Sequence, residues 1–238
     1  MSAPRKSARY TAAVIVAAGA STRMHTEGSK TLLPLDGKPV LAHTLLAFQN
    51  AATVSEIVVV ARAEDIDAVF DIQEIYGITK LRAVARGGAT RALSVEAGLK
   101  KIRPDADFIA IHDGARCLIT PEGVDSVIEA AYRYRAASAA MPVFDTVKIA
   151  TKRGYIASTI DRNTVFTVQT PQVFQAELYF AALSSVTDRE NLTDDNQLME
   201  KLGFPVRLVD IGRENLKITH PEDLSLAEFI LKKRSQTL

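Results

Sequence analysis

The chain has 238 residues, of which 47% are hydrophobic and 24% are charged, and its formal net charge at pH 7 is +1. These values are typical of a globular protein with one substantial core, and the near-neutral balance favours neither a nucleic-acid partner nor a membrane surface. The lone Cys117 cannot form an intrachain disulfide, no apolar run is long enough to span a bilayer, and the N-terminus lacks the apolar core of a secretory signal. We therefore expect a cytoplasmic protein.

Residues 1–11 predict a flexible, solvated tail, and residues 12–238 predict a single domain. The tail carries Arg5, Lys6 and Arg9, which could serve as a targeting signal. A short polar segment ahead of a first strand is a sufficient explanation for these charges, so we assign them no function.

Strand-like apolar runs alternate with helical patterns along the first half of the chain. The expected strands lie at residues 12–18, 57–61, 81–85 and 107–113. The expected helices run from Pro39 to about residue 50, from the mid-60s to the mid-70s, from about Thr90 to Lys101 and from about Pro121 to Arg135. This alternation predicts an α/β fold with a mostly parallel sheet and helices on both faces.

Two short strand-like segments, 138–150 and about 154–163, follow with no helix between them. A polar turn through Lys152 joins them, which is typical of a hairpin. Because an isolated two-stranded ribbon is marginally stable in water, we expect an arm at about residues 142–164 that protrudes, packs on a second subunit and makes a homodimer. The chain then continues through helices near 176–184 and after Thr193, a strand near 206–209 and a helix after Pro221.

Three of the predicted strands end in polar or glycine-bearing loops. These loops are AAGAS at 17–21, RGGATR at 86–91 and HDGAR at 112–116. In open parallel sheets, ligands bind outside the carboxyl ends of the strands. We therefore expect the three loops to converge on one binding site.

The first loop and the residues that follow it carry cations, but they match neither common nucleotide fingerprint. Gly19 is followed by Ser21 rather than by the further glycines of GxGxxG, and no glycine directly precedes Lys30 as GxxxxGK would require. A dinucleotide site and a standard NTPase site are therefore disfavoured. Arg23 and Lys30 lie seven positions apart and could hold a triphosphate while negative charge develops at a reacting phosphorus. Alternatively, both are solvated surface cations, the usual fate of Arg and Lys.

The second loop is suited to a nucleobase. Gly87 and Gly88 directly precede a predicted helix, and Arg91 and Ser94 lie on one face of that helix. Glycines let backbone donors and acceptors approach the edge of a flat base. The alternative interpretation is a simple turn followed by a helix cap.

The third loop adds a carboxylate and a cation. Asp113 offers hard oxygen ligands for a ribose hydroxyl or a magnesium-bound water, and Arg116 suits a phosphate. We interpret His112 as a residue at the edge of the core. A phosphate monoester is largely dianionic at neutral pH, so it can attack a phosphorus without a general base.

Other chemistry-bearing residues have structural explanations. Cys117 is interpreted as a buried, unreactive thiol rather than a nucleophile. Asp194 and Asp195 could form a metal pair, but capping of the following helix and its dipole explain them. His43 and His220 do not have the spacing of zinc ligands.

The motifs of the chain, taken in order from about residue 12 to 231, resemble those of the 2-C-methyl-D-erythritol 4-phosphate cytidylyltransferases. The segments that carry the resemblance are AAGxSxRM, LPLxGKPVLxHTL, GGxxRxxS, HDGAR, PVxDTVK, TIDRN, QTPQVF, TDD and NLKITxPEDLxLAE. The resemblance implies a Rossmann-like nucleotidyltransferase sheet. It also implies transfer of CMP from CTP to methylerythritol phosphate with release of pyrophosphate, a step of the non-mevalonate route to isoprenoid precursors.

The resemblance also implies roles for individual residues. The nucleotide site would comprise Ala17, Ala18, Gly19, Gly88, Arg91, Ser94, Asp113 and Gly114. The catalytic residues would be Arg23, Lys30, Arg162 and Lys217, with Arg116, Thr146 and Lys148 helping to bind the polyol phosphate. The arm would bring Thr146 and Arg162 to the site of the partner subunit. Mg²⁺ or another divalent cation would be held mainly by the CTP phosphates rather than by a protein metal site.

Departures from the family pattern and two rival functions accompany this interpretation. Ser21, Ser29 and Cys117 replace residues that are commonly glycine, proline and proline in the family. A ribitol 5-phosphate cytidylyltransferase differs mainly in the arm and in the segments DTVK and TIDRN. A non-catalytic nucleotide-binding module would have lost the catalytic cations, which this chain retains.

Overall fold

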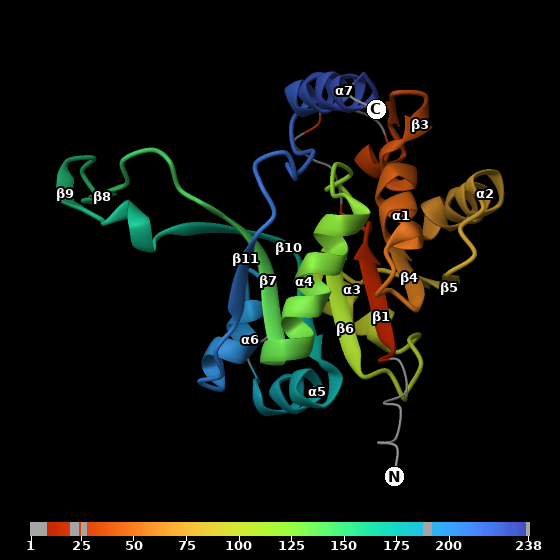
Figure 1. Cartoon of the computed structure of the whole chain (residues 1–238), viewed down its shortest axis with the longest axis horizontal. Coiled ribbons are helices and arrows are strands. Elements are labelled where there is room, and N and C mark those ends of the chain that lie inside the picture. Colours follow the sequence, from red (N-terminus) through yellow and green to blue (C-terminus); the bar gives the residue numbers. More distant parts are fainter. Residues whose placement is uncertain (1–8, 20–23, 25–27, 188–191, 237–238) are drawn as a thin grey trace, which may run out of the picture.

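The computed structural model describes residues 9–19, 24, 28–187 and 192–236. In this part of the chain, a seven-stranded sheet forms the centre of the protein (Figure 1). In sheet order, its strands are β11 (Arg207–Asp210), β7 (Ala136–Pro142), β10 (Phe166–Gln175), β6 (Phe108–Asp113), β1 (Thr11–Val16), β4 (Glu56–Ala61) and β5 (Leu81–Arg86). Only β10 runs antiparallel to its neighbours in this sheet. The predicted α/β class and mostly parallel sheet are therefore confirmed.

Helices cover both faces of the sheet, as predicted. The described helices are α1 (Val40–Asn50), α2 (Ile66–Tyr76), α3 (Arg91–Leu99), α4 (Pro121–Tyr134), α5 (Ala176–Ser185), α6 (Asn196–Lys201) and α7 (Pro221–Ser235). None of them is long and apolar enough to cross a membrane.

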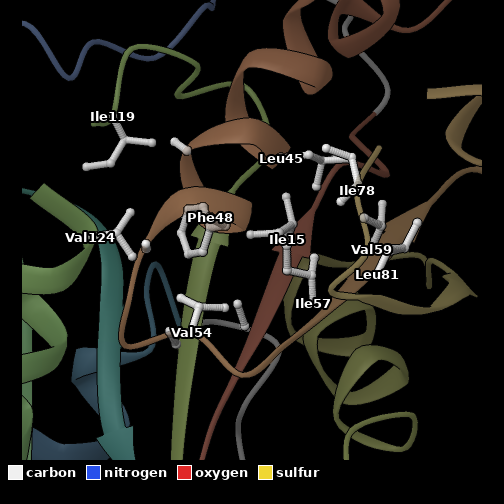
Figure 2. Close-up of a cluster of buried hydrophobic side chains, with 14 of the residues drawn as sticks. Ile15, Leu45, Phe48, Val54, Ile57, Val59, Ile78, Leu81, Ile119 and Val124 are labelled. Carbon is white, nitrogen blue, oxygen red and sulfur yellow. The ribbon is translucent and has the colours of Figure 1, made fainter. Parts of the chain in front are cut away.

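The alternation of side chains along β1 separates two hydrophobic cores. Ala13 and Ile15 belong to the core beneath α1, α2 and α4, whereas Ala12 and Val14 belong to the core beneath α3, α5 and α6. Successive residues of a strand point to opposite faces, so a fully apolar strand must be covered on both sides. Figure 2 shows Phe48 of α1 close to Ile15 in the first of these cores.

A third, smaller core lies beneath α7. Met24, Val40 and Cys117 pack there with Ile218 and Ala227. This core joins the loop after β6 to the segment that precedes α7. Burial raises the pKa of the Cys117 thiol to about 12, so the structure agrees with its interpretation as an unreactive thiol.

β10 is a strand that the sequence did not predict. Pro171 lies in the middle of its run, and proline removes a donor from the ladder, which argues against a central strand. In the structure, a shift in register between Val168 and Gln172 accommodates the proline within the pairing of β10 with β7.

The single strand predicted at 138–150 is wrong, because this segment contains two strands. β7 ends at Pro142 and belongs to the central sheet, whereas β8 (Lys148–Ala150) belongs to the hairpin. The alanine-rich sequence of β7 has weak strand propensity, so packing rather than local preference places it in the sheet.

β8 and β9 (Ile156–Thr159) pair antiparallel in a two-stranded sheet of their own. The hairpin stands away from the central sheet, at the left of Figure 1. Its apolar side chains are solvent-exposed, with 71% of Tyr155 and 69% of Ile156 accessible. We call residues 142–164 the arm.

The domain begins earlier than predicted. Thr11 is fully buried at the start of β1, and the Tyr10 backbone N–H donates to Asp107 at 2.7 Å. The Arg9 guanidinium lies 4.7 Å from the centre of the Tyr132 ring. Residues 9–11 therefore belong to the body of the protein, and the rest of the predicted tail lies outside the described residues.

Candidate active site

A cleft of about 450 Å³ opens at the carboxyl ends of β1, β5 and β6. It is lined by Val16, Ala17, Ala18, Gly19, Lys30, Thr31, Gly88, Ala89, Thr90, Arg91, Ser94, Asp113, Ala115, Lys217 and Thr219. All three predicted loops contribute to this lining. Parallel strands that end at the same edge of a sheet bring their loops together, and this geometry produces the cleft.

Most of the predicted site residues lie in the cleft. The residues found there are Ala17, Ala18, Gly19, Lys30, Gly88, Arg91, Ser94, Asp113 and Lys217. Gly114 lies directly behind them. A Cβ added to Gly114 would be 3.1 Å from Ala17 Cβ, and the Gly114 carbonyl accepts a hydrogen bond from the Thr44 hydroxyl. Arg23 lies outside the described residues.

The second loop is held by contacts that only glycine allows. A Cβ on Gly87 would lie 2.3 Å from Ala18 Cβ, so the first two loops touch each other. Ser94 Oγ accepts from the Gly88 N–H at 3.1 Å and donates to the Thr90 carbonyl at 2.9 Å. These contacts fix the shape of the loop before any ligand arrives.

Asp113, at the end of β6, lies among three cations. Lys217 Nζ donates to its Oδ2 at 2.8 Å, and the Nε atoms of Arg91 and Arg116 each lie 3.7 Å from a carboxylate oxygen. Burial would raise the pKa of Asp113, but the three cations outweigh burial and hold that pKa well below its usual range. Asp113 is therefore ionised and anchors the positive charge around the cleft.

Arg116 does not line the cleft, contrary to the expectation that it contacts a substrate phosphate there. Its side chain is 14% exposed, and its Nη1 donates to the Asn215 carbonyl at 2.9 Å. Burial lowers the pKa of the Arg116 guanidinium, and Asp113 partly opposes this effect. Within one chain, Arg116 supports Asp113 from behind and fixes the segment that carries Lys217.

The side chain of Asp195 was wrongly interpreted as a helix cap. Asp195 makes no side-chain cap hydrogen bond to α6. Its Oδ2 instead accepts from Arg91 Nη1 at 2.6 Å, and its Oδ1 accepts from the Tyr179 hydroxyl at 2.7 Å. Burial lowers the pKa of Arg91, but Asp195 and then Asp113 outweigh it and raise that pKa. The occurrence of TDD among the shared motifs was the available signal for this role.

A network of polar side chains from β10 also escaped the sequence-based interpretation. Thr170 Oγ1 accepts from the Asp113 backbone N–H at 3.0 Å. Asn215 Nδ2 donates to Gln169 Oε1 at 2.9 Å and to the Thr170 carbonyl at 3.0 Å. Thus QTPQVF and NLKIT, noted only as shared motifs, hold the ends of β6 and of the Lys217 segment together.

The arm residues that were predicted to belong to the site do not line this cleft in the same chain. Arg162 Nη1 donates to the Phe144 carbonyl at 2.8 Å, and Lys148 Nζ donates to Thr159 at 2.7 Å. Arg162, Thr146 and Lys148 are exposed, and none lines the cleft of the same chain.

His112 is fully buried, in agreement with its interpretation as a structural residue. Its ring packs 4.9 Å from that of Phe48, its Nδ1 lies 3.1 Å from Thr170 Oγ1, and its Nε2 lies 3.3 Å from the Arg116 carbonyl. Desolvation lowers the pKa of His112 to about 3. The imidazole is therefore neutral at physiological pH.

The buried His112 should make stability depend on pH. Between about pH 6.5 and 3, the unfolded chain binds a proton at this site and the folded chain does not, so the free energy of unfolding should fall as the pH falls. Urea unfolding at pH 7 and at about pH 5 measures this loss, and both values lie more than about one pH unit above the pKa of Asp113 in the unfolded chain. His112→Gln should flatten the dependence. An equally steep loss in His112→Gln would contradict this assignment.

In the described residues, no group of three or more His, Cys, Asp or Glu side chains could hold a metal ion. Among the described residues that line the cleft, Asp113 is the one carboxylate. A divalent ion there would need most of its oxygen ligands from a bound ligand.

Comparison with known proteins gives a consistent result across nearly the whole chain. Residues 11–233 match the family model for 2-C-methyl-D-erythritol 4-phosphate cytidylyltransferase. The enzyme of that name from Caldanaerobacter subterraneus subsp. tengcongensis is 42% identical over 223 residues, which cover 93% of this chain and 98% of the relative. The one from Microcystis aeruginosa is also 42% identical over 223 residues, with the same coverage of both proteins.

Solved structures show the same likeness. A 4-diphosphocytidyl-2C-methyl-D-erythritol synthase from Anaerococcus prevotii superposes with a TM-score of 0.83 at 32% identity, covering 95% of this chain and all of that one. The 2-C-methyl-D-erythritol 4-phosphate cytidylyltransferase from Thermus thermophilus superposes with a TM-score of 0.72 at 32% identity, covering 92% and 98% of the two chains. The sequence motifs, the cleft and these similarities together place the chain in the family of 2-C-methyl-D-erythritol 4-phosphate cytidylyltransferases.

Proposed function

We propose that this protein transfers CMP from CTP to 2-C-methyl-D-erythritol 4-phosphate, giving 4-diphosphocytidyl-2-C-methyl-D-erythritol and pyrophosphate. The reaction is a nucleotidyl transfer in the non-mevalonate route to isoprenoid precursors. The observation that carries this proposal is that Lys30, Arg91 and Lys217 line one cleft together with Asp113, whose carboxylate is paired with Arg91 and Lys217.

The nucleotide would occupy the part of the cleft between the first two loops. Backbone groups of residues 17–19 would approach the phosphates, and Gly88 and Ser94 would border the base. The fixed shape of this region supports the assignment, because the Ser94 hydroxyl already holds the Gly88 N–H. Arg91 and Asp113 would then meet the cytidine.

The cations would act on the reacting phosphorus. A dianionic acceptor that approaches a triphosphate meets Coulomb repulsion, and the attack requires the two reacting atoms to come within about 3 to 3.5 Å. Lys30 and Lys217 both line the cleft, so positive charge is available to oppose this repulsion. We assign Lys30, together with Arg23, to stabilisation of the negatively charged transition state, and Lys217 to the phosphate of the acceptor.

A divalent cation, Mg²⁺ in our proposal, would neutralise charge on the CTP phosphates when bound. Asp113 would be its protein ligand, directly or through water, because carboxylate oxygens suit Mg²⁺ and no other carboxylate lines the described cleft. This chain's own contribution is to keep Asp113 ionised through its three cationic neighbours. A single protein carboxylate fits an ion held mainly by substrate phosphates.

We further propose that the protein is a homodimer in which the arm completes the cleft of the partner subunit. The arm exposes apolar side chains, Ile149, Tyr155 and Ile156, that a second subunit would bury. It also carries Arg162, which is remote from the cleft lining of its own chain. The partner's arm would thus supply Arg162, Thr146 and Lys148 to the acceptor phosphate. The lone, buried Cys117 fits a reducing compartment, and we propose the cytoplasm.

The decisive experiment is measurement of pyrophosphate release from CTP with each candidate acceptor. We expect release with methylerythritol phosphate, and much less with ribitol 5-phosphate or with no acceptor. UTP, ATP and GTP serve as nucleotide controls. Release with ribitol 5-phosphate alone would favour the rival enzyme. Binding of CTP without release in any mixture would favour a non-catalytic module.

A further inference from the structure

Asp195 does not line the cleft, yet it makes the shortest contact recorded for Arg91. Arg91 Nη1 donates to Asp195 Oδ2 at 2.6 Å, whereas Arg91 Nε lies 3.7 Å from Asp113 Oδ1. Asp195 is 5% exposed and directly precedes α6. The guanidinium is therefore near two carboxylates, of which Asp113 lines the cleft and Asp195 does not.

Three contacts fix the position of Asp195. The Tyr179 hydroxyl donates to Oδ1 at 2.7 Å, Arg91 occupies Oδ2, and the Asp195 backbone N–H donates to Gln172 Oε1 at 2.9 Å. Burial and then the charge of Asp195 raise the pKa of the Tyr179 phenol well above its usual value. The phenol thus stays protonated and can keep donating. Because Tyr179 lies on α5 and Gln172 lies on β10, two separate elements hold Asp195 in place as a support for Arg91.

Helix capping does not require the Asp195 side chain. α6 has six residues, and the side-chain acceptor for its first turn is Asp194, which bonds the Gln197 N–H at 3.3 Å. The carboxylate of Asp195 is therefore available for another role. A buried carboxylate is costly unless it is paired, so its retention here depends on Arg91 and Tyr179.

We propose that Asp195, supported by Tyr179, is a positioning residue that holds the Arg91 guanidinium in the orientation in which it binds CTP. Arginine loses side-chain conformational entropy when it is ordered, and prior pairing with Asp195 removes part of that loss from the binding step. A guanidinium has five N–H donors, so the contact with Asp195 leaves others for the nucleotide. This inference rests on the proposed function in that it takes CTP as the ligand.

The same support also bears on Lys217. If Asp195 is replaced by Asn, Arg91 loses its nearer carboxylate partner and, among the described residues, keeps only Asp113. Asp113 already accepts from Lys217 at 2.8 Å, so the two cations would compete for one carboxylate. Asp195 therefore keeps Arg91 on the nucleotide side of the cleft and leaves Asp113 to Lys217.

A double-mutant cycle tests the proposal. Isothermal titration calorimetry with CTP is carried out on the wild type, Asp195→Asn, Arg91→Ala and the double variant. We expect Asp195→Asn to raise the Kd for CTP on the order of tenfold. In the Arg91→Ala background, the same change should alter the Kd less than about twofold, because Asp195 acts through Arg91.

Two further measurements separate positioning from simple loss of stability. Tyr179→Phe removes one hydroxyl and should raise the Kd for CTP about threefold in a folded protein, so it carries the test if Asp195→Asn does not fold. Asp65→Asn is the matched control, because Asp65 is also buried and accepts from Arg62 Nε at 2.7 Å, away from the cleft lining. This control should lower the thermal midpoint without changing the Kd for CTP.

The proposal is overturned if folded Asp195→Asn and Tyr179→Phe bind CTP as the wild type does, or if the effects of Asp195→Asn and Arg91→Ala on binding are additive. These outcomes can be distinguished from failure of the proposed function. If the proposed function is wrong, the wild type would bind CTP but would not transfer CMP to methylerythritol phosphate. The cycle remains decisive there, because its readout is nucleotide affinity rather than turnover.

Discussion

Lys30→Ala should lower kcat by about 10² to 10³-fold, roughly 3 to 4 kcal/mol in transition-state stabilisation, while changing the Kd for CTP only a few-fold. Lys30 begins a short 3-10 turn, Lys30–Leu32, and lines the cleft together with Asp113 and Lys217. Negative charge moves onto the oxygens around the α-phosphorus only as the acceptor attacks. A cation aimed at that charge therefore stabilises the transition state more than the bound substrate.

Steady-state kinetics of pyrophosphate release and calorimetry with CTP test the two halves of this expectation separately. Lys100→Ala is the control for loss of a positive charge, because Lys100 is exposed at the end of α3 opposite to the cleft. Its rate should match that of the wild type. A Lys30→Ala enzyme with an unchanged kcat would remove Lys30 from the catalytic residues.

A heterodimer of one Lys30→Ala subunit and one Arg162→Ala subunit should have about half the wild-type activity, although each parent homodimer is nearly inactive. If the arm acts on the partner's cleft, one of the two sites in this heterodimer combines an intact Lys30 with an intact Arg162. The other site lacks both. Co-expression with two different affinity tags yields the heterodimer for the same pyrophosphate assay.

Two controls make the result specific. A heterodimer of Lys30→Ala with the double variant Lys30→Ala, Arg162→Ala has no intact site and should stay inactive. Arg153→Ala, at an exposed arginine of the arm turn, should retain activity as a homodimer. A heterodimer as inactive as its parents would place Arg162 in the site of its own chain. Sedimentation as a monomer at micromolar concentration would contradict the dimer itself.

The sequence was sufficient to predict those helices and strands whose local hydrophobic pattern agrees with their burial in the folded protein. β1 and β4 are continuous apolar runs bounded by polar or small residues, and they were found within a residue or two of their ends. The cleft followed from them, because the carboxyl ends of parallel strands share one edge of the sheet.

β7 and β10 show where prediction from local sequence patterns fails. The alanines of β7 have weak strand propensity, and Pro171 interrupts the run of β10. Both strands form because their neighbours in the sheet supply hydrogen-bond partners, and because helices such as α4 cover their apolar side chains. Propensity acts along the chain, whereas this stabilisation comes from segments far away in sequence.

By itself, the sequence determined which residues follow β1, β5 and β6, and so the presence of Arg91 and Asp113 at one edge of the sheet. Its resemblance to a known family added Lys30 and Lys217 to the same site. Only the tertiary structure decided how they are paired. Arg91 meets Asp195, and Lys217 meets Asp113, across 104 positions of sequence in each case. Ion pairs of such separation depend on how helices dock on the sheet. No periodicity or local propensity encodes that docking.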